Sequence, residues 1–103
     1  MAVIEAGKDV FTLVVVFTVE AERQQEFVDL LERVAAWHST FPGFISNSIL
    51  RSRDGVRVTE YIQWETEADM QAMRATPGAM DHLRTPGVVS EAHSYIVSSV
   101  TER

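Results

Sequence analysis

The hydrophobic pattern of the chain changes period early. Residues 10–19 (VFTLVVVFTV) are mostly β-branched and aromatic, a composition typical of a strand. Residues 22–39 instead carry apolar side chains at helical spacing, namely Phe27, Leu30, Leu31, Val34 and Ala35. Such a stripe predicts an amphipathic helix, and the turn-forming Phe41-Pro42-Gly43 that follows predicts its end.

The second half of the chain predicts a hairpin, helical segments and a last strand. Residues 44–52 and 56–65 are strand-like and flank Asp54-Gly55, a pair typical of a hairpin turn. Thr66 followed by Asp69 resembles a capping box and predicts a helix with Met70 and Met73 facing inward. Thr76 and Pro77 predict a short helical restart that carries Met80, His82, Leu83 and Arg84. Residues 91–100 predict the last strand.

This order of elements predicts the fold class. Strand, helix, strand, strand, helix, strand is the βαββαβ pattern of the α+β, ferredoxin-like fold with a four-stranded antiparallel sheet. Its helices cover one face of the sheet, yet residues 10–19, central in that topology, are apolar on both faces. A second copy of the chain is the simplest cover, so we expect a homodimer, a dimeric α+β barrel. We expect residues 1–9 to be an N-terminal leader and residues 10–103 to be a single domain.

Composition excludes several classes of protein. The 103 residues include 15 acidic and 9 basic side chains, a formal net charge of -6, with no basic cluster. This argues against binding to nucleic acid or anionic membranes. The chain has no cysteine, which excludes disulfides, thiolate metal sites and cysteine nucleophiles. The longest apolar run, residues 13–17, is too short to span a bilayer, and residues 1–9 do not resemble a signal peptide. We therefore expect a cytoplasmic protein. The three histidines fall on three predicted elements, and we expect no metal site.

The strand over residues 56–65 carries the most suggestive chemistry. Val58, Glu60, Ile62 and Trp64 alternate with its other residues and so share one face, which we expect under the helices. A carboxyl group there is either desolvated, with a raised pKa suited to a general base, or solvated or paired near an edge. Trp64 is either a core side chain or an N–H donor to a substrate oxygen.

Further candidates come from the helical segments and the second strand. Arg84 could hold an oxyanion and His82 could shuttle a proton, although both would also complement helix C-termini. Asn47 is a candidate hydrogen-bonding partner of a substrate or of the backbone. The side chains of Phe27, Trp37, Met70 and Met73 could form the pliable wall of a pocket for a flat ligand, or could pack in the core.

Several phrases resemble the antibiotic biosynthesis monooxygenase family over nearly the whole chain. They are FTLVVVFTV, EFVDLLERV, FPGFISNSILRS, the Asp54-Gly55 hairpin and EYIQWETEADMQAM. The resemblance implies a dimeric ferredoxin-like protein. Its best-understood branch oxidises polyketide anthrones to quinones with molecular oxygen and no cofactor, because the deprotonated substrate itself reduces oxygen.

The resemblance also implies site residues. Trp64 matches the strand-end tryptophan of the family, and Arg84 falls where that branch places an arginine. Glu60 replaces an asparagine common in quinone-forming members, and Met70 replaces a tyrosine found in some, so the substrate or reaction could differ. The haem-degrading branch matches less well. The nearest candidate haem ligand, His82, lies well beyond Trp64, and the first strand lacks the expected asparagine.

Three functions follow as hypotheses. The first is a cofactor-independent monooxygenase that acts on an aromatic polyketide or similar phenol with molecular oxygen. The second is a polyketide cyclase on the same scaffold, with Glu60, His82 and Arg84 promoting ring closure without oxygen. The third is a non-catalytic dimeric small-molecule-binding or stress protein. Oxygen consumption distinguishes the first from the other two.

Overall fold

The computed structural model describes residues 10–103, and the predicted leader over residues 1–9 lies outside the described residues. Strands and helices follow the order expected from the sequence. They are β1 (Phe11–Thr18), α1 (Gln24–His38), β2 (Phe44–Arg51), β3 (Arg57–Trp64), α2 (Glu67–Arg74) and β4 (Val89–Tyr95). Short 3₁₀ helices at Ala21–Arg23 and Asp81–Arg84 precede α1 and β4. The predicted βαββαβ order is confirmed.

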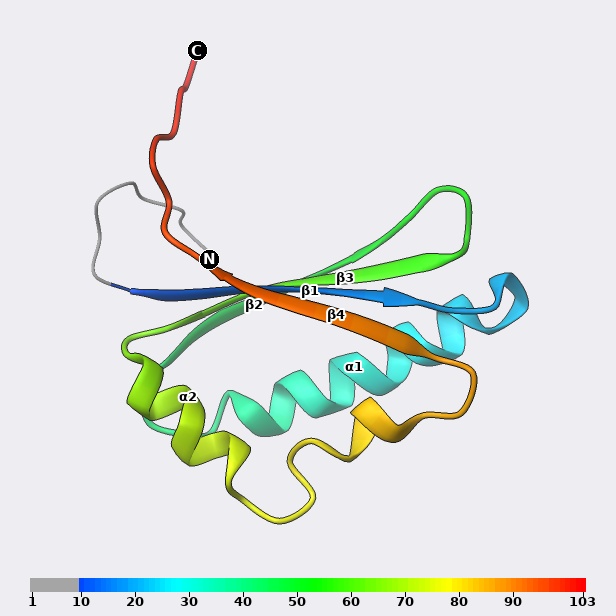
Figure 1. Ribbon diagram of the computed structural model, residues 1–103, viewed down its shortest axis with the longest axis horizontal. Helices are drawn as coiled ribbons and strands as arrows, with labels where there is room; N and C mark the ends of the chain where they lie inside the picture. The colour runs from blue at the N-terminus through cyan, green and yellow to red at the C-terminus, as the bar shows by residue number, and fades with distance from the viewer. Residues whose placement is uncertain (1–9) are drawn as a thin grey trace.

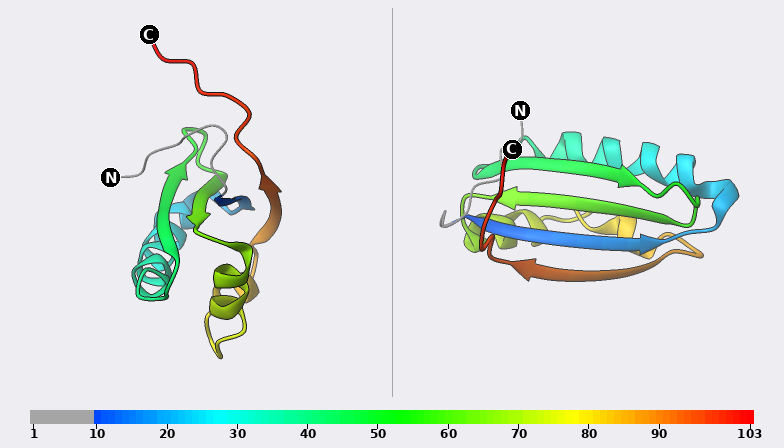
Figure 2. Two further views of the ribbon diagram at one scale, coloured as in Figure 1. Left: turned by 90° about the vertical axis from the view of Figure 1, so that its left-hand side faces the viewer. Right: turned by 90° about the horizontal axis from the view of Figure 1, so that it is seen from above.

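The strands form one antiparallel sheet in the order β2-β3-β1-β4. Figure 2 shows the four strands side by side in its right-hand view, with β1 between β3 and β4. This arrangement is the ferredoxin-like topology, and it confirms that the first strand is central.

Both helices lie on the same side of the sheet (Figure 1). The core beneath them consists of two clusters. The larger contains Val15, Phe17, Val19, Phe27, Val28, Leu31 and Val58. The smaller contains Trp64, Met70, Met73 and Ala79. As predicted, Val58, Glu60 and Trp64 on β3 all point to the helix side, and each is at least 96% buried.

The other side of the sheet, which we call the open face, carries no helix of the described residues (Figure 1). Strand register places Val14 and Val16 of β1 on the open face, where both are half-buried. Leu50, Val89 and Tyr95 flank them on β2 and β4 and are more than half exposed. The second apolar face of β1 therefore lies within a wider apolar patch.

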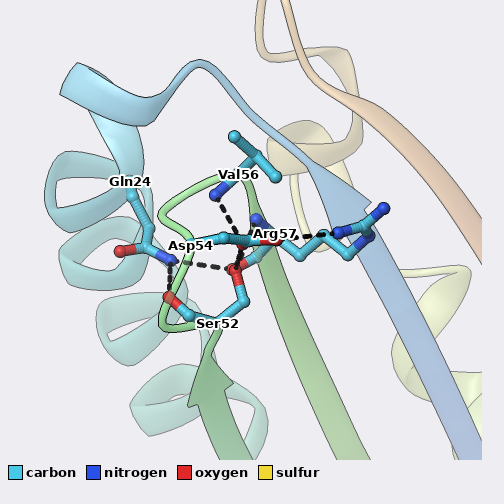
Figure 3. Close-up of polar contacts among 5 residues, drawn as sticks. All are labelled: Gln24, Ser52, Asp54, Val56 and Arg57. Carbon is cyan, nitrogen blue, oxygen red and sulfur yellow. Dashed lines mark hydrogen bonds and ion pairs between the residues drawn. The ribbon is translucent and has the colours of Figure 1, made fainter.

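The turn between β2 and β3 is fastened to the start of α1 (Figure 3). The Gln24 side-chain amide donates hydrogen bonds to the carbonyl oxygens of Ser52 and Arg57, at 3.0 and 2.9 Å. The Asp54 carboxylate accepts from the Ser52 hydroxyl at 2.6 Å and from the Val56 N–H at 3.2 Å. Gly55 has a φ of 85°, the left-handed conformation that favours glycine. The predicted Asp54-Gly55 turn is confirmed.

The start of α2 is also as predicted, since the Asp69 N–H donates to the Thr66 hydroxyl at 3.1 Å. Gly43 packs against this cap. Its φ is +84°, and a Cβ added there would overlap the Asp69 carboxylate. Glycine is therefore required at residue 43, and the close approach joins the end of the α1–β2 connection to the start of α2.

Three predicted boundaries were wrong. The helix expected from residue 22 begins with a 3₁₀ turn, and α1 proper starts at Gln24. The short helix expected after Pro77 is a 3₁₀ turn from Asp81, because Gly78 has a φ of +83°, outside the helical region. The strand expected over 91–100 covers Val89–Tyr95, because Tyr95 pairs with Thr12 near the start of β1 and no β1 partner remains beyond Phe11.

Candidate active site

A cavity of about 270 Å³ lies between the sheet and the helical segments. Its apolar wall includes Leu13, Val15 and Phe17 from β1 and Ile62 from β3. Its polar lining comes from five residues on different elements, His38, Glu60, Arg74, His82 and Ser90. The volume is near the lower end of the ~300–1,000 Å³ typical of small-molecule sites.

The cavity has a buried interior and an exposed mouth. Glu60, His38 and His82 are buried, whereas Arg74 at the end of α2 and Ser90 and Ala92 on the edge strand β4 are exposed. A ligand would therefore enter beside β4 and meet the carboxyl group and imidazoles further in.

Glu60 is the central acidic group of the cavity. It is only 4% exposed, and its carboxylate accepts a hydrogen bond of 2.7 Å from the Asn47 amide. Burial raises the pKa of Glu60, and the Asn47 hydrogen bond opposes part of that rise because it favours the charged form. Asn47 therefore contacts the candidate base, and the pair joins β2 to β3 on the helix side.

Two histidines lie together deeper in the cavity. The rings of His38 and His82 have centroids 6.0 Å apart, and His38 Nε2 donates a 2.8 Å hydrogen bond to the Ala79 carbonyl oxygen. Burial lowers the pKa of His38. Burial, together with the neighbouring His38, lowers the pKa of His82 to about 4, so its ring is uncharged at neutral pH. An imidazole with that pKa is a hydrogen-bonding group near neutral pH and a poor proton shuttle.

Trp64 shares the face of Glu60, as predicted, but packs beside the cavity and does not line it. Trp64 is 1% exposed, and its ring packs edge-on against that of Phe44, with the ring centroids 5.3 Å apart. Met70 and Met73, expected on the pocket wall, pack against Trp64 in the smaller core cluster. Ile62 and Met80 lie between the two regions, since both line the cavity and also pack against that cluster.

Three other expected site residues lie elsewhere. Arg84 points to solvent with its side chain 79% exposed and pairs with Asp81 at 3.2 Å, because both lie on one exposed 3₁₀ turn. Trp37 is 41% exposed on α1 beside Phe41. Phe27 packs against Phe17 at 4.9 Å in the larger core cluster and borders a separate hollow of about 120 Å³ near the start of α1. That hollow holds no buried titratable group.

Only weak sequence signals pointed to the cavity residues that the sequence analysis did not name. His38 ends α1, and its ring reaches the cavity because α1 packs against β2, β3 and the Asp81–Arg84 turn. Ser90 and Ala92 face the cavity through their register with Phe17 and Val15. The only sequence signal for these two residues was their small size on a strand that pairs with a buried one. The third histidine, His93, is exposed and contacts Glu91 at 3.0 Å.

Residues 10–103 offer no group of three or more histidine, aspartate or glutamate side chains placed to hold a metal ion. Within the same range, neither helix has the length and hydropathy needed to cross a bilayer.

A ferredoxin-like sheet with a carboxyl group buried in a largely apolar, side-opening cavity is an arrangement typical of small-molecule enzymes. The sequence pattern of the antibiotic biosynthesis monooxygenases matches residues 10–85. The chain belongs to this family, and it is a monooxygenase.

Comparisons with individual relatives support this family assignment. The chain is 45% identical to tetracenomycin-F1 monooxygenase of Streptomyces glaucescens over 83 residues, which cover 80% of this chain and 74% of the relative. Its structure is similar to SnoaB, a cofactor-independent oxygenase from Streptomyces nogalater, with a TM-score of 0.81 and 26% identity over 92% of this chain and 99% of SnoaB. It is also similar to the ActVA-Orf6 monooxygenase of Streptomyces coelicolor, solved with nanaomycin D. That match has a TM-score of 0.80 and 27% identity, over 93% of this chain and 94% of the other.

Proposed function

We propose that the Glu60 cavity is the active site, where an anthrone- or phenol-like aromatic polyketide is oxidised by molecular oxygen to a quinone, without a cofactor. The observation that carries the proposal is the buried Glu60 carboxyl on the wall of an apolar cavity. The similarity to a tetracenomycin-F1 monooxygenase and to a cofactor-independent oxygenase supports the class of substrate and the lack of a cofactor.

The proposed reaction begins with removal of a proton from a C–H or O–H group of the substrate by ionised Glu60. The resulting carbanion or phenolate gives one electron to oxygen, and the substrate radical and superoxide combine into a peroxide. The peroxide takes up a proton and loses water, which leaves a new carbonyl group. One oxygen atom enters the product and the other leaves as water, so the substrate supplies all the electrons.

Burial fits Glu60 for the first step. A carboxylate with a raised pKa is a stronger base than a solvent-exposed one, and general bases work best when their pKa is near the working pH. Asn47 holds this carboxylate, and we assign it the role of positioning the base.

We assign Trp64 and His82 to hydrogen bonding. Trp64 is 1% exposed beside the cavity, and its indole N–H is a hydrogen-bond donor on an otherwise apolar ring. Ile62 and Met80 line the cavity and also pack against the cluster that contains Trp64. We propose that the indole N–H donates to the carbonyl or peroxide oxygen once a substrate is bound. The uncharged His82 ring, whose Nδ1 has no partner among residues 10–103, is a second candidate hydrogen-bonding group.

We further propose that a second copy of the chain covers the open face. Support comes from the half-buried Val14 and Val16 and the exposed Leu50, Val89 and Tyr95. Contiguous apolar patches of this kind commonly mark an interface. The expected cytoplasmic location stays a prediction from sequence.

The test is an aerobic incubation of chelator-treated protein with a simple anthrone, followed by quinone absorbance and oxygen uptake. We expect quinone formation that needs oxygen, with one atom of ¹⁸O from labelled oxygen in the product. Glu60→Gln should lower the rate by about 10²–10⁴-fold, the usual contribution of a general base. Ring closure without oxygen uptake would support the cyclase alternative instead. A rate of quinone formation equal to that in buffer alone would favour the third hypothesis, a non-catalytic small-molecule-binding protein.

A further inference from the structure

Arg74 is the one permanently charged cation on the wall of the cavity in residues 10–103. The other nitrogen-bearing side chains there are His38 and His82, and burial keeps both uncharged at neutral pH. Arginine stays charged at every working pH. The cavity therefore has a fixed positive charge at its mouth and a carboxyl group in its interior.

The guanidinium of Arg74 makes no ion pair within the described part of the chain. Arg23, Arg57 and Arg84, in contrast, each contact a carboxylate three residues away in the sequence. The raised pKa of Glu60 comes from burial, opposed only by Asn47, so Arg74 is not its counter-charge either. The charge at the mouth is available to a ligand.

The net charge of the chain makes this arrangement selective. With a formal charge of -6, the surface as a whole repels anions, and an anionic ligand needs a local positive group to approach. Arginine suits a planar oxyanion because its N–H groups can bind two oxygens at once.

We propose that Arg74 is the specificity-determining residue of the site and that the ligand is an anionic aromatic compound. Its carboxylate or phenolate oxygen lies against Arg74 at the mouth, and its apolar rings lie against Phe17 and Ile62. This inference rests on the proposed function, because it assumes that the substrate enters the Glu60 cavity. Arg84, the arginine that the sequence favoured for an oxyanion, does not line the cavity and pairs with Asp81.

The test uses ligands that cannot be oxidised further, so that binding is separated from catalysis. Anthraquinone-2-carboxylate and the neutral anthraquinone-2-carboxamide have the same rings, and 2-hydroxyanthraquinone above its phenol pKa and its methyl ether form a second pair. Isothermal titration calorimetry would measure each with the wild type, Arg74→Gln, Arg74→Lys and Arg84→Gln. Arg74 is exposed at the end of α2, so its substitution leaves the core intact.

We expect the wild type to bind at least one anion about tenfold more tightly than its neutral partner, a difference of about 1.4 kcal/mol. The pair that shows the preference identifies a carboxylate or a phenolate as the recognised group. Arg74→Gln should abolish the preference, Arg74→Lys should keep part of it, and Arg84→Gln should keep all of it.

Two results would overturn the inference while leaving the cavity as the site. One is equal binding of anion and neutral partner by the wild type, and the other is a preference that survives Arg74→Gln or disappears in Arg84→Gln. Failure of all four ligands to bind, or binding unaffected by filling the cavity with Ala92→Phe, would count against the proposed site itself.

Discussion

The Asn47 side-chain amide donates a 2.7 Å hydrogen bond to the buried Glu60 carboxylate. The two residues lie on neighbouring strands, β2 and β3, and their side chains meet on the helix side of the sheet. The carbonyl oxygen of the same amide is buried without a partner among the described residues. Because this contact favours the charged form of Glu60, the basicity of the carboxylate depends on Asn47.

Replacing Asn47 by leucine should raise the pKa of Glu60 further, because only the effect of burial would remain. A base works when ionised, so the acidic limb of the pH–rate profile should move to higher pH and turnover near neutral pH should fall. Ser46→Ala is the matched control. Ser46 is the preceding residue, and its buried hydroxyl has no partner in the described chain. An unchanged profile in Asn47→Leu would show that the contact does not tune the base.

Glu60→Gln should also change how stability depends on pH. The pKa of Glu60 is raised above its ordinary value of 4.5, so the folded state holds this proton more tightly than the unfolded state. Its contribution is complete below pH 4.5 and is lost as the pH rises through the raised pKa. We expect Glu60→Gln to gain stability relative to the wild type between pH 4 and pH 8, as measured by thermal unfolding. A constant difference across this range would contradict the burial argument.

His82 should act in the opposite direction. Its pKa falls from 6.5 to about 4 on folding, so its contribution is complete above pH 6.5 and is lost as the pH falls towards 4. The nearby titratable groups are His38, Asp81 and, across the cavity, Glu60. Urea unfolding at pH 7 and pH 4.5 should show that His82→Gln loses about 1–3 kcal/mol less stability than the wild type on acidification. Equal losses would mean that His82 titrates normally.

Trp64→Phe tests the proposed indole donor. Phenylalanine preserves most of the packing against Phe44, Met70 and Met73 but removes the N–H. We expect at least a tenfold drop in turnover with near-normal circular dichroism, in line with the about 10²–10³-fold cost of removing one donor to an oxyanion. Phe44→Leu changes the same cluster without touching a polar group and is the control. Turnover that falls equally in both variants would assign Trp64 to packing alone.

The dimer can be tested on residues that are exposed in a single chain. Sedimentation equilibrium at micromolar concentration should give twice the 11.6 kDa chain mass. Leu50→Glu combined with Val89→Glu should give a folded monomer, because both side chains lie on the open face and are 53% and 70% exposed. Trp37→Gln, an exposed apolar residue on the helix layer, should leave the mass unchanged. A monomeric wild type would refute the proposed assembly.

The periodicity of hydrophobic residues and the turn-forming residues together predicted most of the fold. The order of elements placed β1 at the centre of the sheet, and alternation on β3 placed Glu60 under the helices. The predicted strand boundaries were wrong where pairing with a strand distant in the sequence decides them. An example is β4, which ends at Tyr95 because its pairing partner β1 begins there.

The site was less predictable, because a cavity is set by how elements cross. Nothing local indicates that the helix-terminal His38 meets His82, or that Arg74 reaches the mouth while Arg84 turns to solvent. Phe27, Met70 and Met73 have the same residue types in a core and in a pocket wall, and the structure places them in the core.

Ser90 and Ala92 belong to an edge strand, so the entrance of the cavity is bordered by small side chains on a strand of the sheet. The width of this entrance can be altered at these two positions without disturbing either core cluster. The size of substrate that the site accepts and the strength of its base can therefore change independently as the chain evolves.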